Sequence, residues 1–432
     1  MRFGVSSAAI PSYALHQVRY TTRSMQKIFL SLLAISGLLS AVALPALAKT
    51  VTGFDETTSA ADLQQAYADA GAGGEKVRVL IVPGHEPDSG GAVYQGVYER
   101  EITVEVADEL TRLMEQNPRY EVIVARTGTD WNEELADYFD DEMRDIKKFV
   151  AAQKKLMAKL MRNGDVEQRG DEDQVDHAAA PDDVALRLYG INKWANENDV
   201  DLVLSLHVND APDHGEDSPS AYSGFAAYIP DPQYGNAAAS RSVAESLAAR
   251  IAMMNATSTL PGENAGVVED QDLIAIGAYG TLRVPSVLLE YSYITEPKFT
   301  HPEVRKTVTD DFAYETYLGL QDFFKDPVLT KYSTRSLPYL FTETPTVGSS
   351  SPMAYSLQAG LHVLGFYPLA TAMGTTTLST PASTTPFNSC SISGYMDACT
   401  VEAIGSFQKS QGFEQTGALG PKTRAALNAL LK

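Results

Sequence analysis

Five short, nearly uninterrupted apolar runs limit the folds that this chain can adopt. They lie at residues 77–83, 121–126, 201–207, 224–229 and 286–291. The first reads VRVLIVP and contains a single polar residue, so apolar and polar side chains do not alternate along it. A β-branched run of this kind is typical of a strand that is buried on both faces, as in a parallel sheet.

Helical patterns separate these runs. Residues 99–115 place Ile102, Val106 and Leu110 on one helix face. The other helical patterns lie at 184–197, 236–254 and 304–324. Strands that alternate with helices predict an α/β domain, in which a mostly parallel sheet is flanked by helices in three layers. We expect this domain to span residues 76–325.

The amino-acid composition of the chain changes after this domain. Residues 326–352 are rich in Ser, Thr and Pro, which is typical of a linker. Short amphipathic patterns follow at 354–364, 400–411 and 421–431, with a Thr- and Ser-rich insertion at 369–388. Residues 353–432 are therefore predicted to form a small all-α, three-helix domain.

The N-terminal residues read as a targeting segment. Residues 28–48 carry no charge, Lys27 precedes them, and they end in Ala46-Leu47-Ala48. These features predict a signal peptide over residues 1–48, and the alternative is an uncleaved membrane anchor. We expect an exported protein in the periplasm or cell wall, with no stable membrane anchor after cleavage.

Charge and cysteine content exclude other classes. The chain has 34 Lys and Arg against 55 Asp and Glu, a net charge of −21, so nucleic acid is not an expected partner. Two cysteines rule out a four-cysteine zinc site. Cys390 and Cys399 flank one short segment, and in an exported protein we expect them to form a disulfide.

Four chemistry-bearing residues fall near the same predicted edge of the sheet. His85 follows the first strand, His207 ends the third, Glu290 lies at the end of the fifth, and Glu99 begins the helix after the first strand. Parallel sheets place ligands at the carboxyl ends of their strands. Two imidazoles and one carboxylate are a typical catalytic Zn²⁺ set, and a further glutamate can take a proton from water. We therefore predict His85, Glu99 and His207 as zinc ligands and Glu290 as the catalytic residue.

The motifs that carry these residues resemble a known family. They are VRVLIVPGHEPDSGG at 77–91, VYEREITVEVADEL at 97–110, VLSLHVND at 203–210 and VPSVLLEYSYIT at 284–295. In this order they resemble the zinc-dependent N-acetylmuramoyl-L-alanine amidases of bacterial cell-wall turnover, over about residues 76–325. By position, the resemblance implies that His85, Glu99 and His207 bind zinc and that Glu290 is the catalytic glutamate.

Three positions leave alternatives open. Glu101 lies two residues from Glu99 and is a second candidate ligand, and His214 is a substitute for His207. Glu86 stands where the family usually has glycine. Its side chain could orient a ligand or bind a substrate amide, but we expect it to face solvent.

The C-terminal motifs resemble a second family. SLQAGLHVLGFYP at 356–368, GYMDACTVEAIGSFQKSQG at 394–412 and TGALGPKTRAALNALL at 416–431 are similar to the small peptidoglycan-binding module. The resemblance implies peptidoglycan as the partner of this domain and identifies no contact residue.

Together these resemblances imply an exported hydrolase that cleaves the amide between N-acetylmuramic acid and L-alanine. The alternatives are a non-catalytic wall-binding scaffold and a zinc peptidase that acts within the stem peptide. Residues 131–183 are an insertion, predicted as a helix over 132–162 and an acidic loop over 164–183. This insertion either packs on the flank of the domain or acts as a lid over the groove, which an unknown regulatory partner or contact with the wall moves.

Overall fold

The structure, a computed structural model, describes residues 57–170, 174–177, 179–211, 215, 217–326, 340–367 and 390–431. The expected signal peptide, the alternative ligand His214 and the acidic residues 171–173 lie outside these ranges. Within them, no helix has both the length and the apolar character that crossing a bilayer requires.

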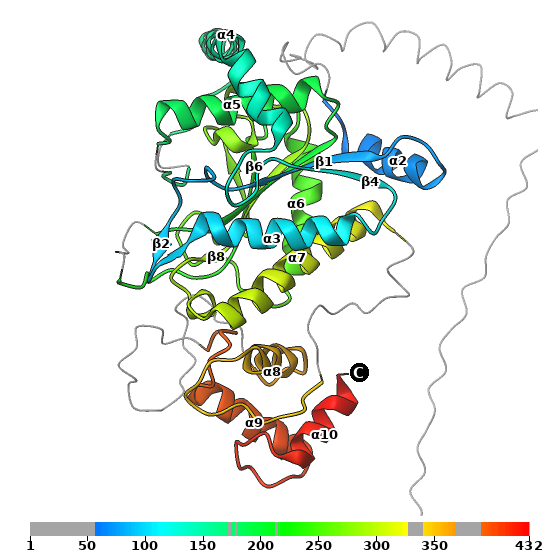
Figure 1. Cartoon of the computed structure of the whole chain (residues 1–432), viewed down its shortest axis with the longest axis vertical. Helices are drawn as coiled ribbons and strands as arrows, with labels where there is room; N and C mark the ends of the chain where they lie inside the picture. The colour runs from blue at the N-terminus through cyan, green and yellow to red at the C-terminus, as the bar shows by residue number, and fades with distance from the viewer. Residues whose placement is uncertain are drawn as a thin grey trace, which may run out of the picture. The chain divides into compact units, whose positions relative to one another are not determined.

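A six-stranded sheet in the order β4-β1-β5-β8-β6-β7 forms the centre of the larger domain (Figure 1). The strands are β1 (Val77–Pro83), β4 (Tyr120–Val124), β5 (Leu202–Asn209), β6 (Ala226–Pro230), β7 (Val267–Asp270) and β8 (Ser286–Tyr293). Strands β4, β1, β5 and β8 run parallel, whereas β6 runs antiparallel to β8 and parallel to β7. The prediction of a mostly parallel sheet is confirmed, and β7 is the strand that it missed.

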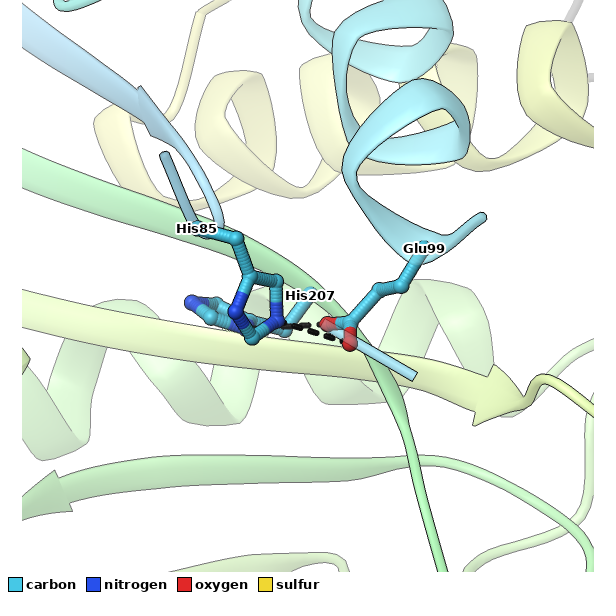
Figure 2. Close-up of side chains that lie close together, drawn as sticks. All are labelled: His85, Glu99 and His207. Atoms are coloured by element: carbon cyan, nitrogen blue, oxygen red, sulfur yellow. Dashed lines mark hydrogen bonds and ion pairs between the residues drawn. The ribbon is translucent and has the colours of Figure 1, made fainter. Parts of the chain in front are cut away.

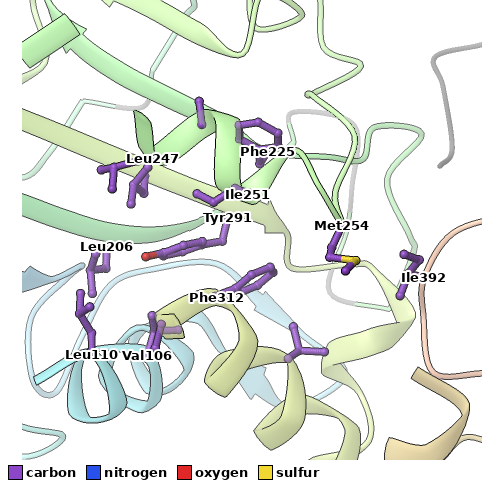
Figure 3. Packing of buried hydrophobic residues seen from close by; sticks show 14 of the residues in the cluster. Val106, Leu110, Leu206, Phe225, Leu247, Ile251, Met254, Tyr291, Phe312 and Ile392 are labelled. Carbon is purple, nitrogen blue, oxygen red and sulfur yellow. The ribbon is translucent and has the colours of Figure 1, made fainter. Parts of the chain in front are cut away.

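Helices cover both faces of this sheet, as the three-layer prediction requires (Figure 1). One face carries α2 (Ala60–Gly71), α3 (Glu99–Met114), α6 (Ala237–Ile251) and α7 (Pro302–Phe324). The other carries α4 (Glu133–Asn163) and α5 (Asp182–Glu197), with short 3₁₀ turns at Ile274–Ile276 and Ala278–Gly280. A third 3₁₀ turn lies at Pro297–Phe299, and a two-stranded hairpin joins β2 (Val93–Tyr94) to β3 (Val97–Tyr98). Figure 3 shows apolar side chains of α3, β5, α6, β8 and α7 meeting in one core.

The inserted helix α4 packs on the flank of the domain. Its N-cap Asn132 accepts a hydrogen bond from the Leu135 amide, and it ends at Gly164 in the left-handed conformation. Buried side chains of α4, among them Phe139 and Ile146, share one apolar cluster with α5. The predicted helix over 132–162 is confirmed, and its contacts with α5 agree with packing on the flank.

The described part of the following loop is attached to the end of β7. Nη2 of Arg169 lies 2.7 Å from Oε2 of Glu269. The side-chain oxygen of Gln174 accepts a hydrogen bond from the amide of Gln271 at 2.9 Å. These contacts place the segment against the sheet, so its removal would expose groups that are now paired.

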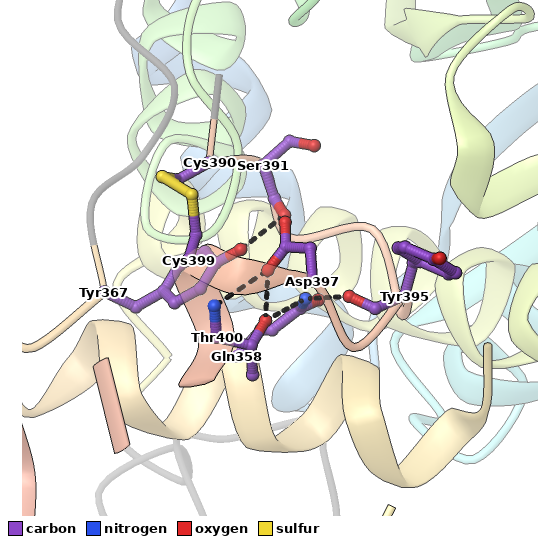
Figure 4. Close-up of a disulfide and its surroundings, with 8 residues drawn as sticks. All are labelled: Gln358, Tyr367, Cys390, Ser391, Tyr395, Asp397, Cys399 and Thr400. Atoms are coloured by element: carbon purple, nitrogen blue, oxygen red, sulfur yellow. Dashed lines mark hydrogen bonds between the residues drawn. A yellow bond between two sulfur atoms is a disulfide. The ribbon is translucent and has the colours of Figure 1, made fainter. Parts of the chain in front are cut away.

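The C-terminal domain contains the three predicted helices, α8 (Pro352–Val363), α9 (Ala398–Ser410) and α10 (Pro421–Leu430). Residues 340–351, which fall within the expected linker, belong to its fold. Phe341 is only 2% exposed, and its amide donates to the side chain of Asn428 at 2.8 Å. The predicted Cys390–Cys399 disulfide is present and lies beside Tyr367 (Figure 4).

This C-terminal domain packs against α7. Tyr355 of α8 is fully buried, and its hydroxyl donates to Asp311 of α7 at 3.3 Å. Ile392 lies in the same apolar cluster as Met254, which follows α6 (Figure 3). A Cβ on Gly394 would come within 2.6 Å of Cγ1 of Val304, so the two surfaces approach closely there. The contact is therefore an apolar interface with a buried hydrogen bond.

We expect Gly394→Ala to destabilise the protein by about 1–3 kcal/mol, because the added Cβ meets Val304 and a φ of +76° strains an alanine. Gly405→Ala is the matched control, because it lies within α9 and no described atom comes within 4 Å of its added Cβ. This control should stabilise the protein by about 0.5–1 kcal/mol, since alanine favours a helix interior over glycine. Denaturant unfolding measures both changes. Equal stability of Gly394→Ala and the wild type would contradict the close approach.

Candidate metal centre and active site

The first site residue stands directly after β1. His85 has a φ of +69°, in the left-handed region, which histidine tolerates better than branched residues do. A Cβ on Gly84 would lie 2.5 Å from Cε1 of His207, and one on Gly91 would lie 2.9 Å from Cδ2 of His85. The two glycines therefore leave the space that the two imidazoles occupy.

Glu99 is the first residue of α3 and is 4% exposed. Backbone amides fix both of its oxygens: Val208 donates to Oε1 at 3.1 Å and Ala92 donates to Oε2 at 3.0 Å. Burial raises the pKa of Glu99, but the opposing effects of His85 and His207 are larger together, and the net pKa is lowered. The carboxylate is thus held in its charged form. Glu101 is exposed, and Glu99 rather than Glu101 lies beside the two histidines.

His85, in the loop after β1, and His207, on β5, both lie against this carboxylate (Figure 2). Nδ1 of His207 lies 3.1 Å from Oε1 of Glu99, and Nε2 of His85 lies 2.7 Å from Oε2. The ring centroids of the two histidines are 5.0 Å apart. One candidate ligand atom from each of the three residues lies within 4.8 Å of the other two.

This group fits a divalent metal ion. Nε2 of His85 is buried and, despite its short distance to Glu99, makes no hydrogen bond of proper geometry. Two imidazoles and one carboxylate are the donor set of catalytic zinc sites. The glycine-lined space and the fixed carboxylate orient these donors toward one another, so the residues predicted as zinc ligands are brought together.

Glu290 lies across from His207 in the register between β8 and β5. Its Oε2 is buried and has no hydrogen-bond partner among the described residues. Burial, followed by the charges of Glu99, Glu263 and Asp210, raises the pKa of Glu290 well above its usual range. An unpaired buried carboxyl group is costly, and such groups are typical of acid–base sites.

Arg126 supports the loop that carries His85. Its buried guanidinium donates to the carbonyl oxygens of Pro83, Gly84, Arg100 and Thr127. Burial lowers the pKa of Arg126 to about 10. Because one side chain satisfies four carbonyls of neighbouring segments, it fixes the end of β1 against the start of α3.

The expectation that Glu86 faces solvent is wrong. Its side chain is buried, at 6% exposure, and accepts a hydrogen bond from Nε of Arg187 at 2.9 Å. Arg187 also binds Asp183 at 2.8 Å. Pairing with an arginine offsets the cost of removing a carboxylate from water. The residue next to His85 is therefore anchored to α5.

A buried acceptor beside Glu290 was not predicted. Glu263 is 1% exposed and accepts hydrogen bonds from the side chains of Asn209, Tyr228, Ser258 and Tyr293. Burial raises the pKa of Tyr228 and of Tyr293, so both phenols remain donors. The sequence signal was weak, because Glu263 lies in an irregular segment and its donors are scattered along the chain.

The match to a family model agrees with the geometry. Residues 79–322, more than half of the chain, match the family described as N-acetylmuramoyl-L-alanine amidase, and residues 350–427 match a peptidoglycan binding domain. A search of curated proteins found no match. The N-acetylmuramoyl-L-alanine amidase from Clostridium difficile 630 is similar at 15% identity, covering 59% of this chain and 99% of that chain, with a TM-score of 0.36. Ami1 from Mycobacterium smegmatis is similar at 16% identity, covering 58% and 98%, with a TM-score of 0.37.

Gly84→Ala should weaken Zn²⁺ binding by about tenfold or more, because the new methyl group displaces the ring of His207. Gly128→Ala is the control, since no described atom lies within 4 Å of its added Cβ. Metal titration followed by elemental analysis measures both variants. The proposed packing would be wrong if the two glycine variants bound zinc equally well.

Proposed function

The chain belongs to the N-acetylmuramoyl-L-alanine amidase family, and from that premise we propose that it is an exported, zinc-dependent peptidoglycan hydrolase. The bond cleaved is the amide between the lactyl group of N-acetylmuramic acid and L-alanine. The observation that carries this proposal is the convergence of His85, Glu99 and His207 beside the unpaired carboxyl group of Glu290.

His85, Glu99 and His207 would hold the zinc ion. When bound, the ion supplies Lewis acidity that polarises the scissile carbonyl and acidifies water. Glu99 contributes the negative charge, and the backbone amides of Val208 and Ala92 keep it in position. Arg126 restrains the loop that presents His85.

Glu290 is assigned the proton transfers. Its carboxylate takes a proton from the attacking water, and the resulting carboxylic acid gives it to the nitrogen of the leaving L-alanine. Two features support this role. Oε2 of Glu290 is not engaged by another described residue, and burial raises the pKa of Glu290, which favours retaining the proton between the two steps.

Two observations support export. Residues 28–48 read as the apolar part of a signal peptide. Cys390 and Cys399 form a disulfide, and disulfides persist in oxidising compartments such as the periplasm or the extracellular space. We propose that residues 340–431 bind peptidoglycan there and bring the catalytic domain to its substrate.

Glu290→Gln should retain zinc but lower turnover of a soluble muropeptide at least a hundredfold, because the metal ligands stay while the proton acceptor is lost. His85→Ala should lose both zinc and activity. Product analysis of digested sacculi identifies the bond, since an amidase releases stem peptides with a free L-alanine amino group.

Three results would contradict parts of this proposal. A Glu290→Gln variant that kept more than a tenth of the wild-type turnover rate would contradict the role assigned to Glu290. Cleavage inside the stem peptide would identify a peptidase instead. A wild-type protein that binds sacculi and zinc without releasing peptide would identify a non-catalytic scaffold.

Deleting residues 340–432 should reduce binding to insoluble sacculi more than hydrolysis of a soluble muropeptide, because the deleted domain raises the local substrate concentration. Sedimentation with sacculi and soluble turnover measure the two effects. Zinc content is the control for an intact catalytic domain. Equal losses on both substrates would argue against a tethering role.

A further inference from the structure

The hydrogen bonds around Glu263 fix the orientation of a neighbouring amide. Glu263 accepts from Tyr293 at 2.7 Å, and also from the hydroxyls of Tyr228 and Ser258. Nδ2 of Asn209 lies 2.9 Å from its Oε1 and 3.0 Å from its Oε2. A carboxylate is an acceptor only, so each group that faces it must donate.

This chemistry decides which end of the Asn209 amide faces Glu263. The two ends of an asparagine amide are assigned from their hydrogen-bond partners. The carbonyl oxygen Oδ1 would be repelled by the carboxylate, so the NH₂ group must point toward Glu263. Oδ1 is thereby directed away from it, and no described residue donates to Oδ1. Asn209 itself is partly exposed.

Asn209 shares a sheet face with the proposed catalytic groups. It lies two residues after His207 on β5, and side chains two apart in a strand point to the same side. Glu290 is the partner of His207 in β8. The register then shifts, so that Tyr293 rather than Ser292 is opposite Asn209. Bulges of this kind change the direction of side chains next to active sites. Here the bulge places the hydroxyl of Tyr293 within hydrogen-bond distance of Glu263.

We infer that Asn209 is a substrate-positioning residue, whose Oδ1 accepts a hydrogen bond from a secondary-amide N–H of the substrate next to the scissile bond. Glu263 is a positioning residue that acts through Asn209 by holding its amide in this orientation. The inference rests on the proposed amidase function, because the substrate is a muropeptide with amide N–H groups on both sides of the cleaved bond.

The test compares three variants with the wild type on soluble muropeptides. Asn209→Ala removes the acceptor and should lower kcat/KM about tenfold, mainly through KM, with zinc content unchanged. Glu263→Gln places an amide beside Asn209, frees its orientation and should cause a similar loss. The double variant should be little worse than either single one, because both act through one contact.

Asn198→Ala is the matched control. Asn198 is also partly exposed and donates to the carbonyl of Trp194, but it precedes β5 at the end opposite Asn209. Its kcat/KM should equal that of the wild type. Two muropeptides, one with L-alanine alone and one with a longer stem peptide, show which substrate N–H binds to Asn209. A loss on both indicates a group at the scissile linkage, and a loss on the longer stem alone indicates the next peptide residue.

A binding measurement separates this inference from the proposed function. In a Glu290→Gln background, calorimetry with intact muropeptide should show about tenfold weaker affinity when Asn209→Ala is added. Unchanged affinity and unchanged KM would overturn the role of Asn209, even if the wild type is an active amidase.

If Asn209→Ala does not fold, the Glu263→Gln variant tests the inference alone. Unchanged affinity of this variant overturns the inference, and weaker affinity with zinc retained supports it. If the wild type releases no peptide, the proposed function is wrong, but the measured muropeptide affinities still test the role of Asn209 in binding.

Discussion

The carboxylate of Glu99 connects the parts of the fold on which the site depends. It stands at the first turn of α3, where the positive end of the helix dipole favours a negative charge. It accepts from the amides of Ala92 and Val208 and contacts the imidazoles of His85 and His207. Removing an isolated carboxylate from water costs several kcal/mol, so these four partners are needed for its burial. The same contacts join the loop after β1, strand β5 and helix α3.

The site residues that were predicted from sequence could be predicted because the strands that carry them run in the same direction. Runs without alternation predicted parallel strands, and parallel strands bring their carboxyl ends to one edge. His207 and Glu290 are direct partners in the β5–β8 register, as expected for residues at the ends of two such runs. Strand β7 was missed because its sequence, VVED, is short and half acidic. The β2–β3 hairpin has two residues in each strand, too few for any period to show.

The part that could not be predicted depends on partners far away in the sequence. Glu86 was expected to face solvent. Its partner, Arg187, lies 101 residues later on α5. Glu263 likewise takes its donors from four separate segments, and each donor is an ordinary polar residue when read alone. Buried polar groups must be paired, but a single sequence does not say which pairs form.

Charge is distributed unevenly between the two domains, and this bears on how the protein meets its polymer. Residues 340–432 contain four acidic and four basic residues, so the whole net charge of −21 lies in the rest of the chain. A domain without net charge approaches an anionic surface without long-range repulsion, whereas the acidic catalytic domain does not. Tyr355 and Asp311 hold this neutral domain on α7. In the proposed function, a binding domain held in this way would limit the orientations of the catalytic edge relative to the polymer.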